Sequence, residues 1–264
     1  MIAMNIFKQF YKSIYSPKDI ALFRFQGIGK TILYVFLLTL LSILPSVYFL
    51  SQAINAGIDS ARAVLKDQLP AFTIKNGQLQ ADTNVPITID QGNFTIILDP
   101  TGAITPKKLS DTDNSFAILK NEFVLMAGGQ TESYAYSMTQ GMQVNKQDVL
   151  DFLNMVNGLR WIILPLVSLF IYFFSTASSF IEVSILALFG LGLRNLAGRK
   201  LNYRQLWRMA AYSETLPTLF FTIMAALKTN VPSSFFINWF VAIMVLFLAI
   251  KETPAPKTTE ELRN

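Results

Sequence analysis

The sequence predicts an integral membrane α-helical protein with four spans and a small, mainly β (α+β) extracytoplasmic domain between spans one and two. Of its 264 residues, 52% are hydrophobic and 15% are charged, whereas a soluble chain carries about 25% charged residues. The mean hydropathy is +0.40. The apolar residues gather into four long blocks, and a turn-rich segment separates the first two blocks.

Residues 1–30 form a basic leader that contains a single acid, Asp19. Between Ile6 and Tyr15, apolar and aromatic residues recur at spacings of three and four, with lysines between them. This pattern predicts an amphipathic helix that lies at the membrane interface against anionic headgroups; docking of a partner is the alternative interpretation. The basic residues of the leader are Lys8, Lys12, Lys18, Arg24 and Lys30.

Span one is predicted at 31–54 and span two at 159–193, because about 20 apolar residues cross a bilayer core. Pro45 is expected to kink the first helix, which membrane helices tolerate. The second block is too long for one straight crossing, so we expect a tilted or extended helix that bends near residues 175–179. An uncleaved anchor is favoured over signal-peptidase cleavage after Ala53, because the leader and apolar stretch exceed signal-peptide lengths.

Spans three and four are predicted at 209–227 and 234–250, joined by a short outer loop at 228–233. The loop 194–208 carries five basic residues and no acid. Since Lys and Arg gather on the cytoplasmic side, we expect this loop, the leader and the tail 251–264 in the cytoplasm. The protein is thus expected to be a multi-pass membrane protein with both termini cytoplasmic.

The segment 55–158 is expected outside the membrane. Its first part, up to Pro70, keeps helical spacing and extends span one as a stalk. Beyond it, β-branched and aromatic runs alternate with turn residues such as Asn76-Gly77, which predicts about six strands in a small antiparallel sheet. Asn145 is expected to cap a helix that enters span two, with Asp148 in its first turn. The strand candidates are 72–74, Leu79, 86–89, 94–98, 116–119, 123–126 and 133–138.

The composition excludes several kinds of chemistry. The chain has no His and no Cys, so the commonest general base and thiolate chemistry are absent. Gly27–Thr31 mimics the end of a phosphate-binding loop, but Arg24 occupies the place of the required first glycine. Asp111–Glu122 mimics a calcium loop, but Phe116 stands where a glycine makes the sharp turn. No catalytic residue, cofactor or metal ion is therefore expected.

Two acids, Glu182 and Glu214, lie inside predicted spans, where a carboxyl is costly and marks a functional candidate. We expect spans two and three to pack so that Glu182 approaches Glu214, Arg208 or Tyr212. These four residues form the candidate intramembrane polar cluster. A hydrogen-bonded clamp between helices and a role in proton, ion or substrate binding remain alternatives.

Several stretches of the chain carry a resemblance to a known family: Phe10, Ser13, Ser16–Lys18, Phe23–Gln26, Gly29–Thr31, Ile97–Gly102 and Gly198–Pro217. They resemble the bacterial domain-of-unknown-function family 1189. This resemblance implies a location in the bacterial cell membrane, but no established activity and no catalytic residues. Members occur mainly in Gram-positive bacteria, and some carry the label of maltodextrin-utilisation membrane proteins. The last two spans are also distantly similar to Yip-type membrane proteins.

The expected function is that of a non-enzymatic multi-pass membrane protein. It would be an accessory, assembly or regulatory partner of a membrane complex such as a sugar (maltodextrin) transporter. The expected partners are the lipid bilayer and a membrane protein or a second copy, with no nucleic acid. The alternatives are a small secondary transporter or channel that uses the intramembrane Glu residues, and a membrane hydrolase that uses acids of the outer segment.

Overall fold

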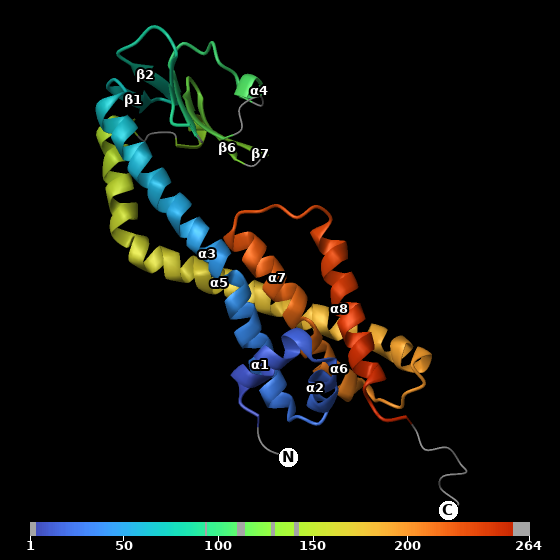
Figure 1. Ribbon diagram of the computed structural model, residues 1–264. Helices are drawn as coiled ribbons and strands as arrows, with labels where there is room; N and C mark the ends of the chain where they lie inside the picture. Colours follow the sequence, from blue (N-terminus) through green and yellow to red (C-terminus); the bar gives the residue numbers. More distant parts are fainter. Residues whose placement is uncertain (1–3, 93, 110–113, 128–129, 140–142, 256–264) are drawn as a thin grey trace, which may run out of the picture. The chain divides into compact units, whose positions relative to one another are not determined.

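The computed structural model describes residues 4–92, 94–109, 114–127, 130–139 and 143–255 (Figure 1). The chain forms two compact units. The helical unit comprises Met1–Leu50 and Pro165–Asn264, and the β unit comprises Ser51–Leu164. The residues Asp111 and Asp113 of the calcium-loop mimic, and most of the tail 251–264, lie outside the described residues.

Three helices within the described ranges are long and apolar enough to cross a membrane: α3, α5 and α8. Helix α3 (Ile28–Asp67) continues through Pro45 and includes the predicted stalk. Helix α5 (Lys146–Leu196) is a single helix of 51 residues, and α8 covers Ser234–Lys251. The structure therefore combines long apolar helices with a β region after the first of them.

The stretch 209–227, predicted as the third span, is not one helix. Helix α6 (Tyr203–Ser213) ends before Glu214, and α7 (Thr215–Ala226) begins after it. The physical reason is Pro217, which has no N–H to donate to the carbonyl of Ser213 four residues earlier. In the same turn, the Thr215 hydroxyl donates to the Tyr212 carbonyl at 2.7 Å.

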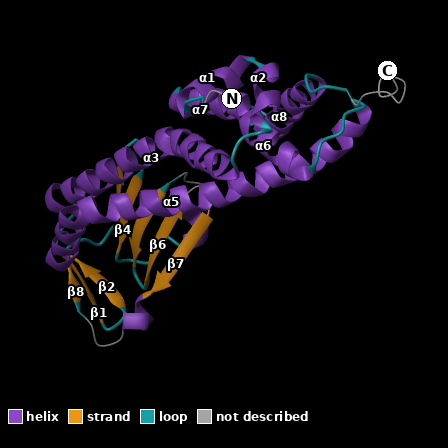
Figure 2. Ribbon diagram, turned by 90° about the horizontal axis from the view of Figure 1, so that it is seen from below, coloured by secondary structure: helices purple, strands orange, loops and turns teal. Residues whose placement is uncertain are grey.

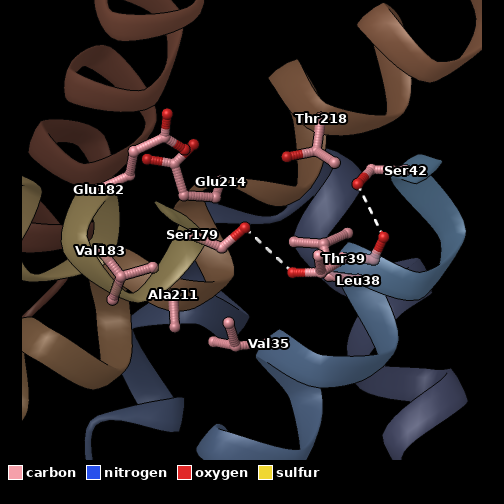
Figure 3. A pocket seen from close by; sticks show the side chains of 10 residues that line it. All are labelled: Val35, Leu38, Thr39, Ser42, Ser179, Glu182, Val183, Ala211, Glu214 and Thr218. Carbon is pink, nitrogen blue, oxygen red and sulfur yellow. Dashed lines mark hydrogen bonds between the residues drawn. The ribbon is translucent and has the colours of Figure 1, made fainter. Parts of the chain in front are cut away.

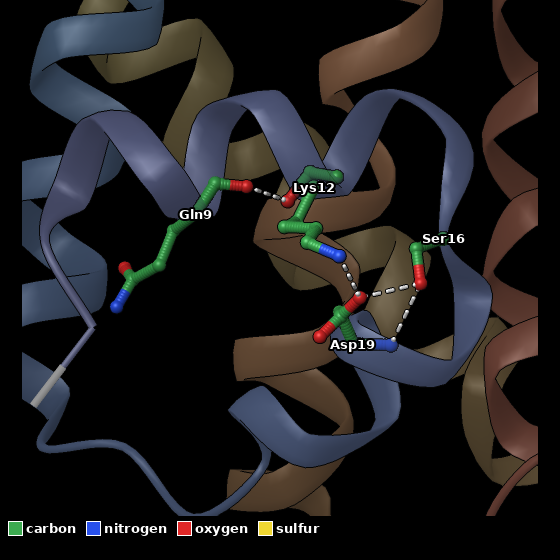
Figure 4. Close-up of polar contacts among 5 residues, drawn as sticks. Gln9, Lys12, Ser16 and Asp19 are labelled. Atoms are coloured by element: carbon green, nitrogen blue, oxygen red, sulfur yellow. Dashed lines mark hydrogen bonds and ion pairs between the residues drawn. The ribbon is translucent and has the colours of Figure 1, made fainter. Parts of the chain in front are cut away.

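Two short helices, α1 (Ile6–Tyr15) and α2 (Pro17–Phe23), precede α3 in the helical unit. Ser16 separates them, and Pro17 starts α2 at a position where its missing N–H is not needed. Figure 4 shows Asp19 accepting a hydrogen bond from the Ser16 hydroxyl (2.6 Å) and pairing with the Lys12 ammonium (3.4 Å). These contacts hold the corner between α1 and α2.

The core of the helical unit is built where α5, α6 and α8 approach closely. A Cβ on Gly190 of α5 would come within 3.2 Å of a Leu206 side-chain carbon and 3.3 Å of one from Leu246. Both leucines are fully buried, so the glycine permits this close contact. The core also receives residues from α2 and α3: Ile20, Ala21, Phe23, Tyr34, Val35 and Leu38.

The β unit contains two sheets, seen in Figure 2. The order of the three-stranded sheet is β2-β1-β8, and that of the five-stranded sheet is β3-β4-β5-β6-β7. The strands are β1 (Phe72–Lys75), β2 (Gln78–Ala81), β3 (Ile87–Asp90), β4 (Thr95–Asp99), β5 (Ser115–Leu119), β6 (Glu122–Ala127), β7 (Gln130–Ala135) and β8 (Val144–Asn145). The 3-10 helix Tyr136–Thr139 follows β7, where the sequence predicted a continued strand.

The prediction of one antiparallel sheet is wrong. Strand β4 pairs with β5 in parallel, with Ile97 opposite Ala117. A parallel pair needs a crossover connection instead of a hairpin, and the short helix α4 (Pro106–Leu109) lies in that connection. Leu109 packs with Ile97 and Ala117 in a small core of its own.

Asp99 organises the chain where β4 ends. Its side chain is fully buried and accepts hydrogen bonds from the backbone N–H groups of Thr101 (2.9 Å) and Ile104 (2.6 Å). It also accepts from the Thr101 hydroxyl (2.6 Å) and the Gly102 N–H (3.1 Å). Burial by itself raises the pKa of Asp99, but these hydrogen bonds to the charged form outweigh it and lower the pKa below its ordinary value.

Two local predictions for this unit are confirmed. Asn76 and Gly77 have φ values of 53° and 76°, as the predicted tight turn between β1 and β2 requires. At the start of α5, the Asp148 N–H donates to the Asn145 side chain (3.0 Å), and the Asn145 N–H donates to the Asp148 carboxylate (2.8 Å). These reciprocal bonds satisfy N–H groups that the first turn of a helix leaves unpaired.

Candidate functional site

Glu182 and Glu214 line one small cavity in the helical unit, with a volume of about 30 Å³. Glu182 lies on α5, and Glu214 lies at the junction between α6 and α7. Figure 3 shows the two carboxyl groups next to each other. The Glu214 side chain is buried, with 6% of its surface exposed. Neither carboxyl forms a hydrogen bond or ion pair with any residue that the structure describes.

The rest of the cavity wall supplies hydroxyl groups and apolar side chains. The Thr39 hydroxyl donates to Ser179 at 3.0 Å, and the Ser42 hydroxyl donates to the Thr39 carbonyl at 2.8 Å (Figure 3). Ser179 and Glu182 are three residues apart on α5, so they share one face of the helix. The remaining lining residues are Val35, Leu38, Val183, Ala211 and Thr218.

The helix break that the sequence did not predict places Glu214 in this cavity. Its N–H still donates to the Ala210 carbonyl at 3.2 Å, and its carbonyl accepts from Thr218 at 3.0 Å. Glu214 therefore joins α6 to α7 while its side chain faces α5. A proline three residues after an acid in an apolar block is the sequence feature that could have indicated this break.

Arg208 and Tyr212, the other two members of the predicted cluster, contact different partners. The Arg208 guanidinium donates to the Arg24 carbonyl at 2.9 Å. The Tyr212 hydroxyl donates to the Gln9 side chain at 3.0 Å. The Tyr212 ring lies 4.6 Å from the ring of Phe23 and 4.3 Å from that of Tyr34. The structure thus brings together the two acids and directs the other two side chains to the N-terminal segment.

Gln9 and Ser13 have a role in packing that the sequence patterns did not predict. Both are buried on α1, and they are four residues apart, so they share a face. The face of α1 that carries Gln9 and Ser13 therefore packs into the helical unit, together with the partly buried Ile6 and Phe10, whereas Phe7 and Tyr11 are exposed. The sequence held one indication of this packing: Gln9 and Ser13 are uncharged polar residues at helical spacing within an otherwise basic and aromatic segment.

The carboxyl pair suits a proton or a small cation better than an organic substrate. Two adjacent ionised carboxylates repel each other unless a positive charge lies between them. A volume of about 30 Å³ holds a water molecule or an ion of similar size, whereas ligand pockets for organic molecules measure about 300–1,000 Å³.

The fold and this site define a class of protein: a mixed helical and β chain whose described part has three helices apolar enough for a membrane and a carboxyl pair inside the helical unit. A family model described as "Protein of unknown function (DUF1189)" matches residues 7–250. The chain belongs to this family. No curated protein and no solved structure matches the chain.

Proposed function

We propose that the chain crosses the bacterial cell membrane four times, with both termini cytoplasmic and residues 55–158 outside. Two contacts within the helical unit support this topology. Arg199, just after α5, donates to the carbonyl of Lys251 at the end of α8, at 3.0 Å. At the end of α7, the Lys228 ammonium lies 4.5 Å from the centre of the Phe49 ring.

Two positions along α3 bear on the depth of α6 and α7: Ile28 lines one hollow with Tyr203 at the start of α6, and Phe49 contacts Lys228 after the end of α7. Phe49 follows the start of α3 by about 21 residues, a rise of roughly 32 Å. Because the end of α7 contacts Phe49, α6 and α7 together cover about the depth of a bilayer core despite the break at Glu214. In the four-span topology, α6 and α7 therefore cross the membrane together as the third span, with the break at Glu214 inside it.

Within this topology, we propose a non-enzymatic accessory role: the chain binds another membrane protein, for which a sugar transporter is the candidate. The observation that carries the proposal is an apolar face of α5. Its lining residues form a groove of about 560 Å³: Leu166, Val167, Phe170, Ile171, Phe174 and Ser175. Of the most apolar stretch of α5, only 6% is buried inside the described chain.

The shape of this face suits a second helix. The groove residues recur at spacings of one, three and four, so they form one strip along α5. Phe170 and Phe174 stack with their ring centres 6.2 Å apart and form a continuous wall. Packing into such a wall gives a membrane helix the van der Waals contact that drives association in lipid.

The test is photo-crosslinking in native membranes from α5. A photoreactive residue in place of Phe170 should give a discrete adduct with a multi-pass membrane protein, identified by mass spectrometry as a transporter subunit. The control is Leu169, equally exposed (61% against 59%) but about 100° around the helix; it should label lipid. Lipid adducts alone from both positions, or adducts with a second copy of the chain, would contradict the proposal.

The alternative function, a small transporter or channel, is favoured by the carboxyl pair. In proteoliposomes, we expect no sugar flux above that of protein-free liposomes, because the cavity of about 30 Å³ does not admit a sugar. Proton and sodium fluxes are measured in parallel, with the double variant Glu182→Gln and Glu214→Gln. Proton or sodium flux that disappears in this double variant would support the alternative over the accessory role.

A further inference from the structure

A second hollow of the helical unit lies at the start of α6. Its volume is about 470 Å³, and five residues line it: Ile28, Tyr203, Arg204, Trp207 and Arg208. We call it the arginine groove. Ile28 is the first residue of α3, so the groove lies where the basic leader gives way to an apolar helix.

The groove has positive charge without a matching acid. Arg204 and Arg208 are four residues apart on α6 and share a face. Arg204 is exposed and has no hydrogen bond or ion pair with the described part of the chain. Arg208 donates through one terminal nitrogen to the Arg24 carbonyl, and its buried Nε faces away from solvent. The guanidinium of Arg204 and the second terminal nitrogen of Arg208 therefore retain donors for an anion.

The aromatic wall of the groove is held in place by α5. The Trp207 ring lies nearly parallel to the ring of Phe180, with an angle of 8° and 6.3 Å between centres. Its indole N–H donates to the Ser184 hydroxyl at 3.2 Å. Trp side chains are favoured at the level of lipid headgroups, where one edge is polar and the rest apolar.

We propose that the arginine groove binds the phosphate of an anionic phospholipid headgroup. Guanidinium groups offer paired N–H donors that match phosphate oxygens. Basic hollows beside membrane helices on the cytoplasmic side suit anionic headgroups. A volume of about 470 Å³ accommodates a headgroup, and Ile28 and Trp207 provide apolar contact for the glycerol and the start of the chains. The proposal rests on the membrane location proposed above.

The test uses the full chain in nanodiscs of phosphatidylcholine, with and without phosphatidylglycerol. After transfer to detergent, native mass spectrometry measures how much phosphatidylglycerol remains bound. The double variant Arg204→Gln and Arg208→Gln should bind it roughly 30-fold more weakly, since each basic residue near a membrane surface contributes a factor of about five. The single variant Arg204→Gln, which alters no observed contact, should show a smaller loss and retain the wild-type melting temperature.

The charge-matched control is the double variant Lys8→Gln and Lys18→Gln, two exposed residues of the leader. It should retain phosphatidylglycerol as the wild type does. Equal retention of phosphatidylglycerol in the wild type and both arginine variants would overturn the proposal. Displacement of the bound phosphatidylglycerol by inorganic phosphate alone would also contradict it, because the ligand would then be a free anion. Release of the wild-type chain from membranes by alkaline extraction would contradict the membrane function itself, independently of the groove.

Discussion

Replacing Asp99 by asparagine is expected to destabilise the five-stranded sheet by about 3 kcal/mol or more. The buried carboxylate accepts hydrogen bonds from four donors. An asparagine keeps one acceptor oxygen for the three donors that meet Oδ1, but its NH₂ group then faces the Ile104 N–H, a buried donor left unsatisfied at about 1–3 kcal/mol. The three remaining bonds add to this loss, because they no longer have an ionised acceptor. The measurement is hydrogen exchange of the full chain in detergent, read at β4 and β5.

The matched control for this prediction is Asp90→Asn in the neighbouring turn. Among the described residues, Asp90 accepts one hydrogen bond, from the Gly92 N–H at 2.7 Å, in an exposed setting. Its replacement should change stability by less than about 1 kcal/mol. Equal exchange rates in β4 and β5 for the two variants would show that the Asp99 contacts do not hold the sheet.

The lowered pKa of Asp99 adds a pH dependence to this prediction. A carboxyl whose pKa is lower in the folded state stabilises that state above its unfolded pKa of about 3.9 and loses this contribution as pH falls through the folded value. The stability difference between wild type and Asp99→Asn should therefore be full at neutral pH and shrink below about pH 4. A difference that stays constant into acid would contradict the assignment.

The features predicted correctly from the sequence depend on a few neighbouring residues. The turn at Asn76-Gly77 needs only two residues that tolerate positive φ. The cap at Asn145 needs only a side-chain acceptor and an acid three residues later. The continuation of the helix beyond the predicted span one follows from spacing alone, and α3 does continue to Asp67.

The features that the sequence did not predict depend on distant partners. Runs of β-branched and aromatic residues identify β4 and β5 but do not say that the two strands pair in parallel, because such runs suit either direction. The cost of a carboxyl in lipid predicted that Glu182 would approach one of three groups, and the structure selects Glu214. The Tyr212 hydroxyl meets Gln9, 203 positions away, and no local pattern specifies such a contact.

Tyr212→Ala is expected to have the largest effect in the helical unit, a loss of about 3–5 kcal/mol. The Tyr212 side chain is fully buried, and its ring packs between Phe23 of α2 and Tyr34 of α3. Removing the ring leaves a cavity where the N-terminal helices meet α6. The measurement is thermal unfolding of the full chain in detergent, together with the rate of trypsin cleavage at Lys8 and Lys12.

In the same experiment, Tyr212→Phe separates the contribution of the hydroxyl to stability from that of the ring. It keeps the packing but leaves the buried Gln9 side-chain oxygen without its donor, at a cost of about 1–3 kcal/mol. Adding Gln9→Met should recover much of that loss, because an apolar pair of similar volume needs no hydrogen bond. In this double variant, trypsin should again cleave α1 as slowly as it does in the wild type. If the double variant is less stable than Tyr212→Phe alone, the Gln9–Tyr212 hydrogen bond is not what holds α1 against α6.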